Sequence, residues 1–116
     1  MLKFIEYPKC STCRKAKKYL DQLGLKHDDR HIVEEKLNKE ELQALYQKSG
    51  LPLKRFFNTS GLKYRELNLK DKLPTMSEDE QLELLASDGM LVKRPIVETE
   101  NLVLVGFKAS EYDSLK

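Results

Sequence analysis

The sequence predicts a single α/β domain in which a mixed sheet is flanked by helices. Three observations indicate this fold class: a strand–helix–strand pattern in residues 2–33, a helical middle, and two β-rich segments followed by a helix near the end. The order β-α-β, then helices, then β-β-α is typical of such a layered arrangement. A length of 116 residues suits one domain, 1–116, with a modest hydrophobic core.

The first three elements form a β-α-β unit. Residues 2–6 (LKFIE) predict a short strand that ends at Tyr7-Pro8. The next segment predicts a helix that stops at Gly24, because its apolar residues recur at helical spacing: Cys13, Ala16, Leu20 and Leu23. Residues 27–33 (HDDRHIV) are a weaker strand candidate. A unit of this kind has a right-handed crossover in nearly all known proteins.

Two capping boxes mark helices in the middle of the chain. Asn38, followed three residues later by Glu41, begins a helix that Gly50 closes. Ser77 and Glu80 begin a second helix in the stretch SEDEQLELLASDG. The middle of the chain is therefore predicted to be helical.

The remaining segments complete the predicted fold. Pro52 prevents simple continuation of the first capped helix, and FFNTSGLKYREL predicts two short helical turns around the loop 58–61. RPIVE and NLVLVG, joined by a turn near 99–101, predict a β-hairpin, and KASEYDSLK a final helix. No repeat or linker divides the chain.

Composition and charge limit the classes of partner. The chain has 21 basic and 19 acidic residues, a formal net charge of +2, which gives no sign of a nucleic-acid or membrane surface. No apolar run approaches the ~20 residues that a membrane-spanning helix needs, and the charged start MLKFIEY is unlike a signal peptide. A cytoplasmic monomer is expected. A basic cluster forms either a solvated helix face or a positive field beside the cysteines: Lys9, Arg14, Lys15, Lys17 and Lys18.

Cys10 and Cys13 are the only cysteines of the chain. In a reducing compartment such a pair indicates redox chemistry or metal binding rather than a permanent disulfide. With His27 and His31 they match the spacing of a two-Cys, two-His zinc finger. Four residues along a strand, however, separate two histidines by about 13 Å, whereas zinc–nitrogen bonds are about 2 Å long. We therefore expect no metal, and two plain strand histidines.

Cys10 falls at the junction of the first strand and helix, where a thiolate is favoured. Backbone N–H groups and the helix dipole attract an anion there, and thiols at such sites have pKa values of about 3.5–7.5. Cys13 lies one turn on, with Cβ atoms about 5–6 Å apart, whereas a disulfide needs about 3.5–4.5 Å. The bond would therefore require a tightened first turn and be easily reduced. The CxxC pattern predicts a redox pair, with Cys10 as nucleophile and Cys13 as resolving thiol.

Arg94 and Pro95, in the stretch LVKRPIV, form a second candidate site. Pro95 is either a strand-edge proline beside a solvated arginine, or a cis proline that exposes backbone opposite the thiol. In the second case Arg94 offers a planar donor fork to an oxyanion. The residues alone do not choose between these two interpretations.

Four stretches, in this order, resemble the arsenate reductase (ArsC)/Spx family: YPKCSTCRKA, FFNTSGLKYRELNL, LVKRPIV and LVGFKASEY. The resemblance covers nearly the whole chain and implies a thioredoxin-like core with a helical insertion at roughly residues 35–90. It implies roles for four residues: Cys10 as nucleophile, Arg14 in organising its loop, Arg94 in binding an oxyanion or thiol substrate, and Pro95 after a cis peptide bond.

Three positions depart from parts of this family. Glutaredoxin-linked arsenate reductases resemble this chain but have further arginines where it has Asn58 and Phe107. Charged hydrogen bonds contribute about 1.5–3 kcal/mol each, so oxyanion binding should be weaker here. The NTSG and GFK pieces are similar to the YffB-like branch, for which the resemblance implies glutathione-dependent thiol reduction. The second cysteine is similar to Spx, a transcription regulator that binds the RNA polymerase α subunit, but Pro52 stands where Spx-type proteins have glycine.

The expected activity is thiol–disulfide exchange by the Cys10–Cys13 pair. We expect Arg14 and the helix amides to stabilise the thiolate, Arg94 to hold an anionic substrate group, and glutathione or thioredoxin to restore the thiols, with no bound cofactor. Two alternatives remain open: reduction of arsenate, and redox-sensing transcriptional regulation. The expected partners are accordingly a thiol, disulfide or oxyanion substrate, a glutaredoxin or thioredoxin, or the RNA polymerase α subunit.

Overall fold

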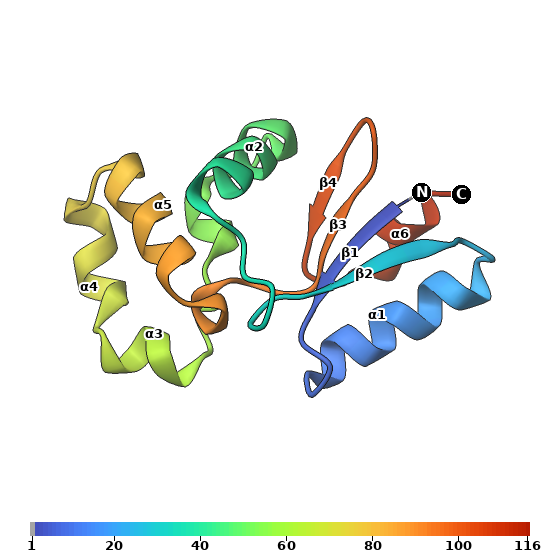
Figure 1. Ribbon diagram of the computed structural model, residues 1–116, viewed down its shortest axis with the longest axis horizontal. Coiled ribbons are helices and arrows are strands. Elements are labelled where there is room, and N and C mark those ends of the chain that lie inside the picture. The colour runs from blue at the N-terminus through green and yellow to red at the C-terminus, as the bar shows by residue number, and fades with distance from the viewer. Residues whose placement is uncertain (1) are drawn as a thin grey trace.

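The sheet is mixed, as the sequence predicts. It contains β1 (Leu2–Glu6), β2 (His27–His31), β3 (Ile96–Glu98) and β4 (Val103–Val105), in the order β2-β1-β3-β4. β2 runs parallel to β1, whereas β3 is antiparallel to both β1 and β4. The computed structural model describes residues 2–116, and Figure 1 shows the sheet in one half of an elongated molecule that measures 42 × 27 × 25 Å.

One face of the sheet is covered by α1 (Ser11–Gln22) and α6 (Ala109–Asp113). Alternate residues of β1 point to this face, so Leu2 and Phe4 pack against the apolar side of α1. The buried cluster on this side contains Leu2, Phe4, Ala16, Leu20, Val97 and Tyr112. Cys13 lies on the same buried side of α1 and is fully buried.

The helical insertion lies between β2 and β3 and forms the other half of the molecule (Figure 1). It contains α2 (Lys39–Ser49), α3 (Leu62–Glu66), α4 (Leu69–Lys72) and α5 (Glu78–Ser87), with 3-10 turns at Leu53–Phe56, Leu73–Thr75 and Gly89–Leu91. Its large buried cluster includes Ile5 and Ile96 of the sheet. Both halves therefore share one continuous apolar contact across the second face of the sheet.

Both predicted capping boxes are present. The Asn38 side chain accepts from the main-chain N–H of Glu41, and the Ser77 side chain accepts from that of Glu80. Gly50 has a left-handed conformation and ends α2, as predicted. The second capped helix ends at Ser87, slightly earlier than the sequence suggests, because the Asp88 side chain caps the following 3-10 turn.

The sequence did not predict α4. Its N-cap, Asn68, has a left-handed conformation (φ 53°) and makes no side-chain capping bond. The two apolar residues at the ends of this short helix, Leu69 and Leu73, are both buried in the insertion's core. Burial of these leucines, rather than a local capping signal, therefore accounts for the element.

Gly89 allows the end of the insertion to lie directly against the segment after β2. A Cβ atom at this position would be 2.1 Å from the carbonyl oxygen of Ile32, so only glycine fits. The chain then leads through Arg94 into β3. Among the described residues, no helix is long and apolar enough to cross a membrane.

Candidate functional site

Cys10 is the N-cap of α1. Its backbone is extended (φ −81°, ψ 122°), and its sulfur accepts a hydrogen bond from the main-chain N–H of Cys13 over 3.4 Å. The main-chain N–H of Cys10 in turn donates to the carbonyl oxygen of Tyr7 at 2.9 Å. This tight turn from β1 presents a partly exposed sulfur at the positive end of the helix.

The two thiols have opposite pKa shifts. Partial burial alone would raise the pKa of Cys10, but the N–H and S–H groups of Cys13 and the guanidinium of Arg94 outweigh it, and the pKa is lowered. Burial raises the pKa of Cys13 to about 12, and the nearby charge of Cys10 adds to that rise. Both cysteines are present as free thiols. The site therefore pairs one readily ionised sulfur with one that stays protonated.

Arg94 faces this thiol from the end of the insertion. Its Nη1 donates to the carbonyl oxygen of Met90 at 3.4 Å, and its Cζ lies 5.2 Å from the centroid of the Tyr7 ring. The peptide bond between Arg94 and the buried Pro95 is cis, as the resemblance implies. Asn58 Nδ2 also donates to the Met90 oxygen, at 3.5 Å, so this amide lies next to the guanidinium.

A groove of about 280 Å³ borders Arg94. Its walls come from the loop before α3, from α3 itself and from the last turn of the insertion; they are Asn58, Gly61, Leu62, Lys63, Glu66, Asp88, Met90 and Arg94. Leu62 is 67% exposed there, and Lys63 Nζ lies 4.0 Å from an Asp88 oxygen. The groove thus combines two cations, Lys63 and Arg94, with two carboxylates, Glu66 and Asp88, and the apolar side chain of Leu62.

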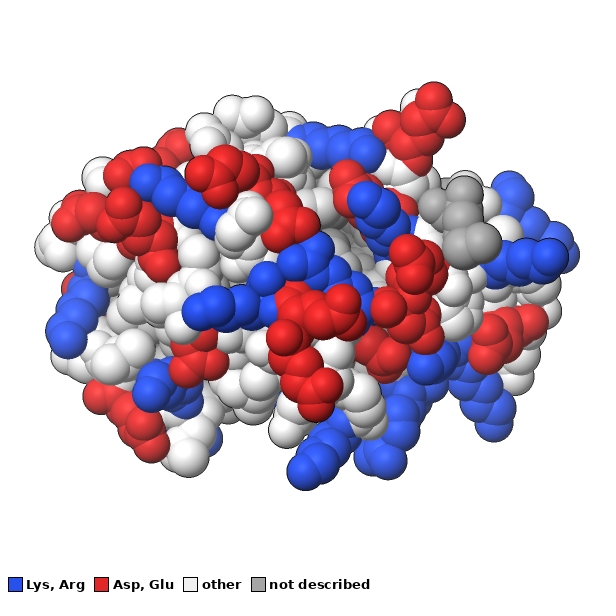
Figure 2. Space-filling view, viewed as in Figure 1, with Lys and Arg blue, Asp and Glu red and all other residues white. Residues whose placement is uncertain are grey.

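Arg14 lies differently from Arg94. Its main-chain N–H donates to the Cys10 carbonyl oxygen at 3.1 Å, whereas its side chain is exposed on the solvent side of α1. Within residues 2–116, no hydrogen bond or ion pair joins the Arg14 side chain to Cys10. Figure 2 shows Lys and Arg side chains gathered over the edge formed by α1. The role predicted for Arg14 at the thiol therefore stays a prediction.

Phe107, the other position expected to differ from arsenate reductases, belongs to an aromatic cluster. Its ring lies 4.9 Å from that of Tyr112 and 5.6 Å from that of Tyr19, measured between centroids. This cluster joins α1 to α6. Phe107 therefore packs the helical layer, whereas Asn58 borders the groove beside Arg94.

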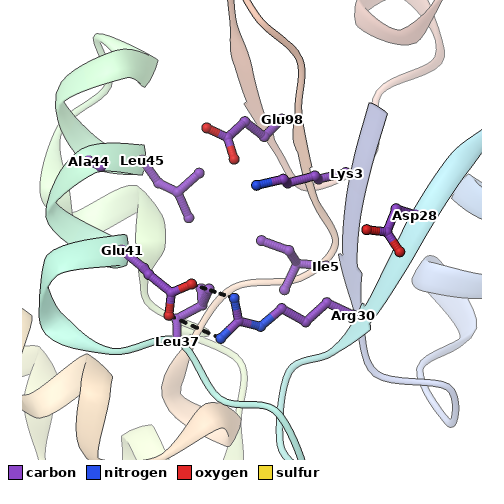
Figure 3. Close-up of a pocket in the computed structure, with 9 residues that line it drawn as sticks. All are labelled: Lys3, Ile5, Asp28, Arg30, Leu37, Glu41, Ala44, Leu45 and Glu98. Carbon is purple, nitrogen blue, oxygen red and sulfur yellow. Dashed lines mark hydrogen bonds and ion pairs between the residues drawn. The ribbon is translucent and has the colours of Figure 1, made fainter. Parts of the chain in front are cut away.

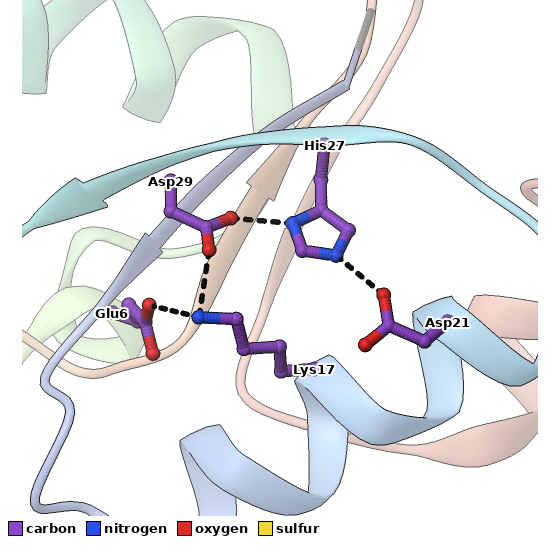
Figure 4. A network of polar contacts seen from close by, with 5 residues as sticks. All are labelled: Glu6, Lys17, Asp21, His27 and Asp29. Atoms are coloured by element: carbon purple, nitrogen blue, oxygen red, sulfur yellow. Dashed lines mark hydrogen bonds and ion pairs between the residues drawn. The ribbon is translucent and has the colours of Figure 1, made fainter.

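A polar network anchors the helix that carries the cysteines (Figure 4). Lys17 of α1 forms ion pairs with Glu6 of β1 at 3.1 Å and with Asp29 of β2 at 2.8 Å. His27 bonds to Asp29 and, at 2.9 Å, to Asp21. Glu6 is buried, and these contacts hold the middle and last turn of α1 against β1 and β2.

A second cavity, of about 350 Å³, lies between the sheet and α2 (Figure 3). Charged side chains of both signs line it, and Arg30 forms a two-pronged ion pair with Glu41 across it. Lys3 and Glu98 extend into the same space from β1 and β3 (Figure 3). It contains neither cysteine, so it is separate from the thiol site.

The histidines lie on β2, as predicted. His31 Nδ1 accepts main-chain N–H bonds from Val33 and Glu34, both at 3.1 Å, so its proton is on Nε2. The ring of His31 also meets the Tyr7 ring edge-on, with centroids 5.7 Å apart. In the part of the chain that the structure describes, no group of three or more His, Cys, Asp or Glu is arranged to hold a metal ion.

Sequence reasoning did not find Tyr7 or Met90. Both contact Arg94, one through its ring and the other through its main-chain carbonyl. The sequence contained no usable signal for either contact, because Arg94 is far from Tyr7 along the chain and any residue type supplies a carbonyl oxygen.

Comparisons with known proteins agree with this fold. The ArsC family model matches residues 5–115. The chain is 63% identical over 112 residues to YusI of Bacillus subtilis (strain 168), covering 97% of this chain and 95% of YusI. It is 32% identical over 112 residues to the global transcriptional regulator Spx of Enterococcus faecalis (strain ATCC 700802 / V583), covering 96% of this chain and 83% of Spx.

A solved structure supports the same assignment. The crystal structure of a protein related to the ArsC family from Bacteroides fragilis matches with a TM-score of 0.97 and 55% identity, over 99% of this chain and 97% of that one. The thioredoxin-like core with an inserted helical segment is therefore confirmed. Because the family model and these relatives cover almost the whole sequence, the chain belongs to the ArsC family.

Proposed function

We propose that the protein is a thiol–disulfide oxidoreductase whose reactive group is the Cys10 thiolate. The observation that carries this proposal is the arrangement of the two sulfurs. Cys10 receives the N–H of Cys13 at a helix start and faces Arg94, while the Cys13 sulfur is fully buried one turn away. The thiolate is the attacking species in disulfide exchange, and a neutral neighbouring thiol is held in reserve for the second step.

The reaction then has two exchange steps. The Cys10 thiolate attacks one sulfur of a substrate disulfide, which forms a mixed disulfide and releases the other half as a thiolate. Cys13 next loses its proton to that departing thiolate and attacks the Cys10 sulfur, which releases the second half. The two cysteine sulfurs supply two electrons and become an intramolecular disulfide. Cys13 supplies one proton, and the second departing thiolate takes its proton from solvent, to which Cys10 lost one when it ionised.

The first step also prepares the second. The negative charge on Cys10 helps to keep Cys13 protonated. Once Cys10 is in a mixed disulfide, that charge is gone, and the pKa of Cys13 falls toward the value that burial alone sets. The resolving thiol is thus activated only after substrate has bound covalently. Two equivalents of glutathione, or one thioredoxin dithiol, would restore the pair in a reducing cytoplasm.

The groove beside Arg94 supports an anionic substrate half. Arg94 is a planar donor for a carboxylate, and Lys63 lines the same groove. The apolar side chain of Leu62 offers a contact for the uncharged part of the same molecule. A carboxylate-bearing thiol, such as glutathione, has the required combination of groups.

The test is reduction of glutathione disulfide and of a mixed disulfide of glutathione with a reporter thiol. Cys10→Ser should lose all turnover, whereas Cys13→Ser should accumulate a glutathione adduct on Cys10 that intact-mass measurement detects. Full turnover by Cys10→Ser would overturn the assignment of the nucleophile. Turnover by Cys13→Ser without any adduct would remove the resolving role.

Regulation of transcription is the second candidate, because the Spx relative is 32% identical over 96% of this chain. Pull-down with the carboxy-terminal domain of the RNA polymerase α subunit tests it. Saturable binding without reductase activity would favour the regulator. Arsenate reduction with either reductant should be poor, because Asn58 supplies no charge beside Arg94.

A further inference from the structure

The Tyr7 ring lies in contact with the arginine that faces the reactive sulfur. The Arg94 guanidinium carbon is 5.2 Å from the centroid of this ring, within the range of a cation–π contact. Tyr7 also touches the cysteines through its main chain: its carbonyl oxygen accepts from Cys10 N–H at 2.9 Å, and its N–H lies at the Cys13 sulfur. One residue therefore contacts all three groups of the site.

We propose that Tyr7 is the positioning residue for Arg94, and that its ring holds the guanidinium against Cys10 so that the thiolate forms and reacts. This role rests on the proposed thiol chemistry. It adds Tyr7 as a residue that acts on the thiolate through Arg94. In this role Tyr7 acts only through Arg94.

Arg94 needs such a partner because little else restrains it. Apart from its interaction with the Cys10 sulfur, its side-chain hydrogen bond to protein in the described chain is the one to the Met90 carbonyl, which is long at 3.4 Å. No Asp or Glu within residues 2–116 forms an ion pair with it. An arginine with several rotatable bonds loses conformational entropy when it is held in one place.

An aromatic face suits this task better than a carboxylate. A carboxylate would hold the guanidinium more firmly, but its negative charge would cancel the positive charge that Cys10 feels. The ring quadrupole attracts the cation and adds no net charge. Tyr7 thus restrains Arg94 and leaves its charge available to the thiolate.

The Tyr7 ring is itself held in place by packing contacts. Its ring packs against the insertion's core and meets the His31 ring edge-on, at 5.7 Å and 87°. His31 is fixed by two main-chain N–H bonds at the end of β2, from Val33 and Glu34. A continuous row of contacts therefore runs from the end of β2 through His31, Tyr7 and Arg94 to Cys10.

The experiment compares Tyr7→Phe with Tyr7→Leu by following alkylation of Cys10 with iodoacetamide across pH, peptide by peptide. Phenylalanine keeps the ring face, so its pH profile should match the wild type. Leucine removes the face, so the Cys10 profile should shift to higher pH and the rate near pH 6.5 should fall about two- to fivefold. A wild-type profile for Tyr7→Leu, or equal loss in Tyr7→Phe, would overturn the proposal.

A second comparison separates positioning from general damage. In an Arg94→Met background, Tyr7→Leu should cause no further shift, because the group that it positions is gone. A further shift of the same size would show that Tyr7 acts by another route. Tyr7→Met serves in the same comparison where Tyr7→Leu fails to fold, as judged by circular dichroism. Alkylation needs no substrate, so these outcomes stand apart from success or failure of the proposed reductase activity.

Discussion

The main-chain N–H of Cys13 donates to the Cys10 sulfur across 3.4 Å, while the sulfur of Cys13 itself is fully buried. The same residue therefore stabilises its neighbour's negative charge through its backbone and resists ionisation at its own side chain. These two effects are separable, because any residue at position 13 except proline keeps the backbone donor.

Cys13→Ala should raise the pKa of Cys10, but not as far as the ordinary value for a cysteine. The substitution removes the thiol hydrogen bond from Cys13, but the N–H donor and the Arg94 guanidinium remain. The pKa of Cys10 should therefore stay below 9.0, the ordinary value for a cysteine. The pH dependence of iodoacetamide alkylation measures it.

The reciprocal variant, Cys10→Ala, should shift the pKa of the remaining cysteine in the opposite direction. Cys10→Ala removes the charge that helps to raise the pKa of Cys13, so this pKa should fall from about 12 yet stay above 9.0 because burial persists. A Cys13 that alkylates as fast as a free thiol in Cys10→Ala would contradict the role given to burial.

Cys10 also stabilises the helix as its N-cap, which predicts different stabilities for two inactive variants. Serine is a preferred N-cap residue and keeps an acceptor for Cys13 N–H. The urea midpoint of Cys10→Ser should therefore be at least as high as that of the wild type. Alanine leaves this donor unpaired, so Cys10→Ala should be less stable by about 1 kcal/mol. Urea unfolding measures both, and equal stability of the two variants would mean that the sulfur contributes nothing as a cap.

Local signals explain why so much of the fold was predictable from the sequence. Helix α2 begins at a capping box and ends at a left-handed glycine, and both signals are set by a few neighbouring residues. Cys10 was placed correctly for the same reason, since a strand that breaks at Pro8 before a helix fixes the junction. The helix α4 had no such signal, because its N-cap Asn68 makes no capping bond.

The two arginines show where sequence reasoning stops. Arg14 is close to Cys10 in sequence, but the helix turns its side chain toward solvent. Arg94 reaches Cys10 only because the insertion and the strands fold back on each other. Nearness in the chain is thus a poor guide to which cation faces a thiol, and the contact with Tyr7 depends wholly on tertiary packing.

Lys17 and Lys18 form a matched pair for testing the network below the site. Lys17→Met should lower the free energy of unfolding by about 1–2 kcal/mol, because it leaves the buried Glu6 without its ion pair. This is less than for a fully buried pair, since the Lys17 side chain is 40% exposed. The measurement is urea unfolding at pH 7.

Lys18→Met is the control, because Lys18 is exposed and no ion pair within residues 2–116 includes it. Its stability should stay within about 0.5 kcal/mol of the wild type. Equal losses in both variants would show that the effect comes from removing positive charge and not from the contacts with Glu6 and Asp29.

His27 should make the free energy of unfolding decrease as the pH rises through the folded-state pKa of this residue. Burial alone would lower its pKa, but the carboxylates of Asp21 and Asp29 outweigh this and raise it above 6.5. A raised folded-state pKa stabilises the protein fully below pH 6.5, and that contribution is lost as pH rises through the folded value. Urea midpoints should therefore fall as the pH rises above 6.5.

His27→Gln should remove this decline, and Asp21→Asn should reduce it, because Asp21 supplies one of the two carboxylates. Asp29 should affect stability at acidic pH instead. Burial alone would raise its pKa, but Lys17 and His27 outweigh this and lower it below 3.8, so its contribution is lost as pH falls through the lowered value. A decline in His27→Gln as steep as in the wild type would exclude His27 as its source.

Gly89 and Gly24 require glycine for different reasons: Gly89 because a Cβ atom would clash with a neighbouring residue, and Gly24 because its backbone is left-handed. Gly89→Ala would bring a Cβ atom within 2.1 Å of the Ile32 carbonyl, so the turn must move, at a cost of about 1–3 kcal/mol. That turn carries Met90, whose carbonyl receives Arg94, so the variant should also raise the pKa of Cys10.

Gly24→Ala is the matched control. Gly24 has a left-handed φ of +74°, but no atom lies within 4 Å of the added Cβ. The substitution should therefore cost about 1–2 kcal/mol through backbone strain alone and leave the alkylation profile of Cys10 unchanged. Because both variants lose comparable stability, only a shift of the Cys10 profile in Gly89→Ala, absent from Gly24→Ala, links the turn to the thiol. Identical profiles in the two variants would show that Arg94 does not depend on the position of this turn.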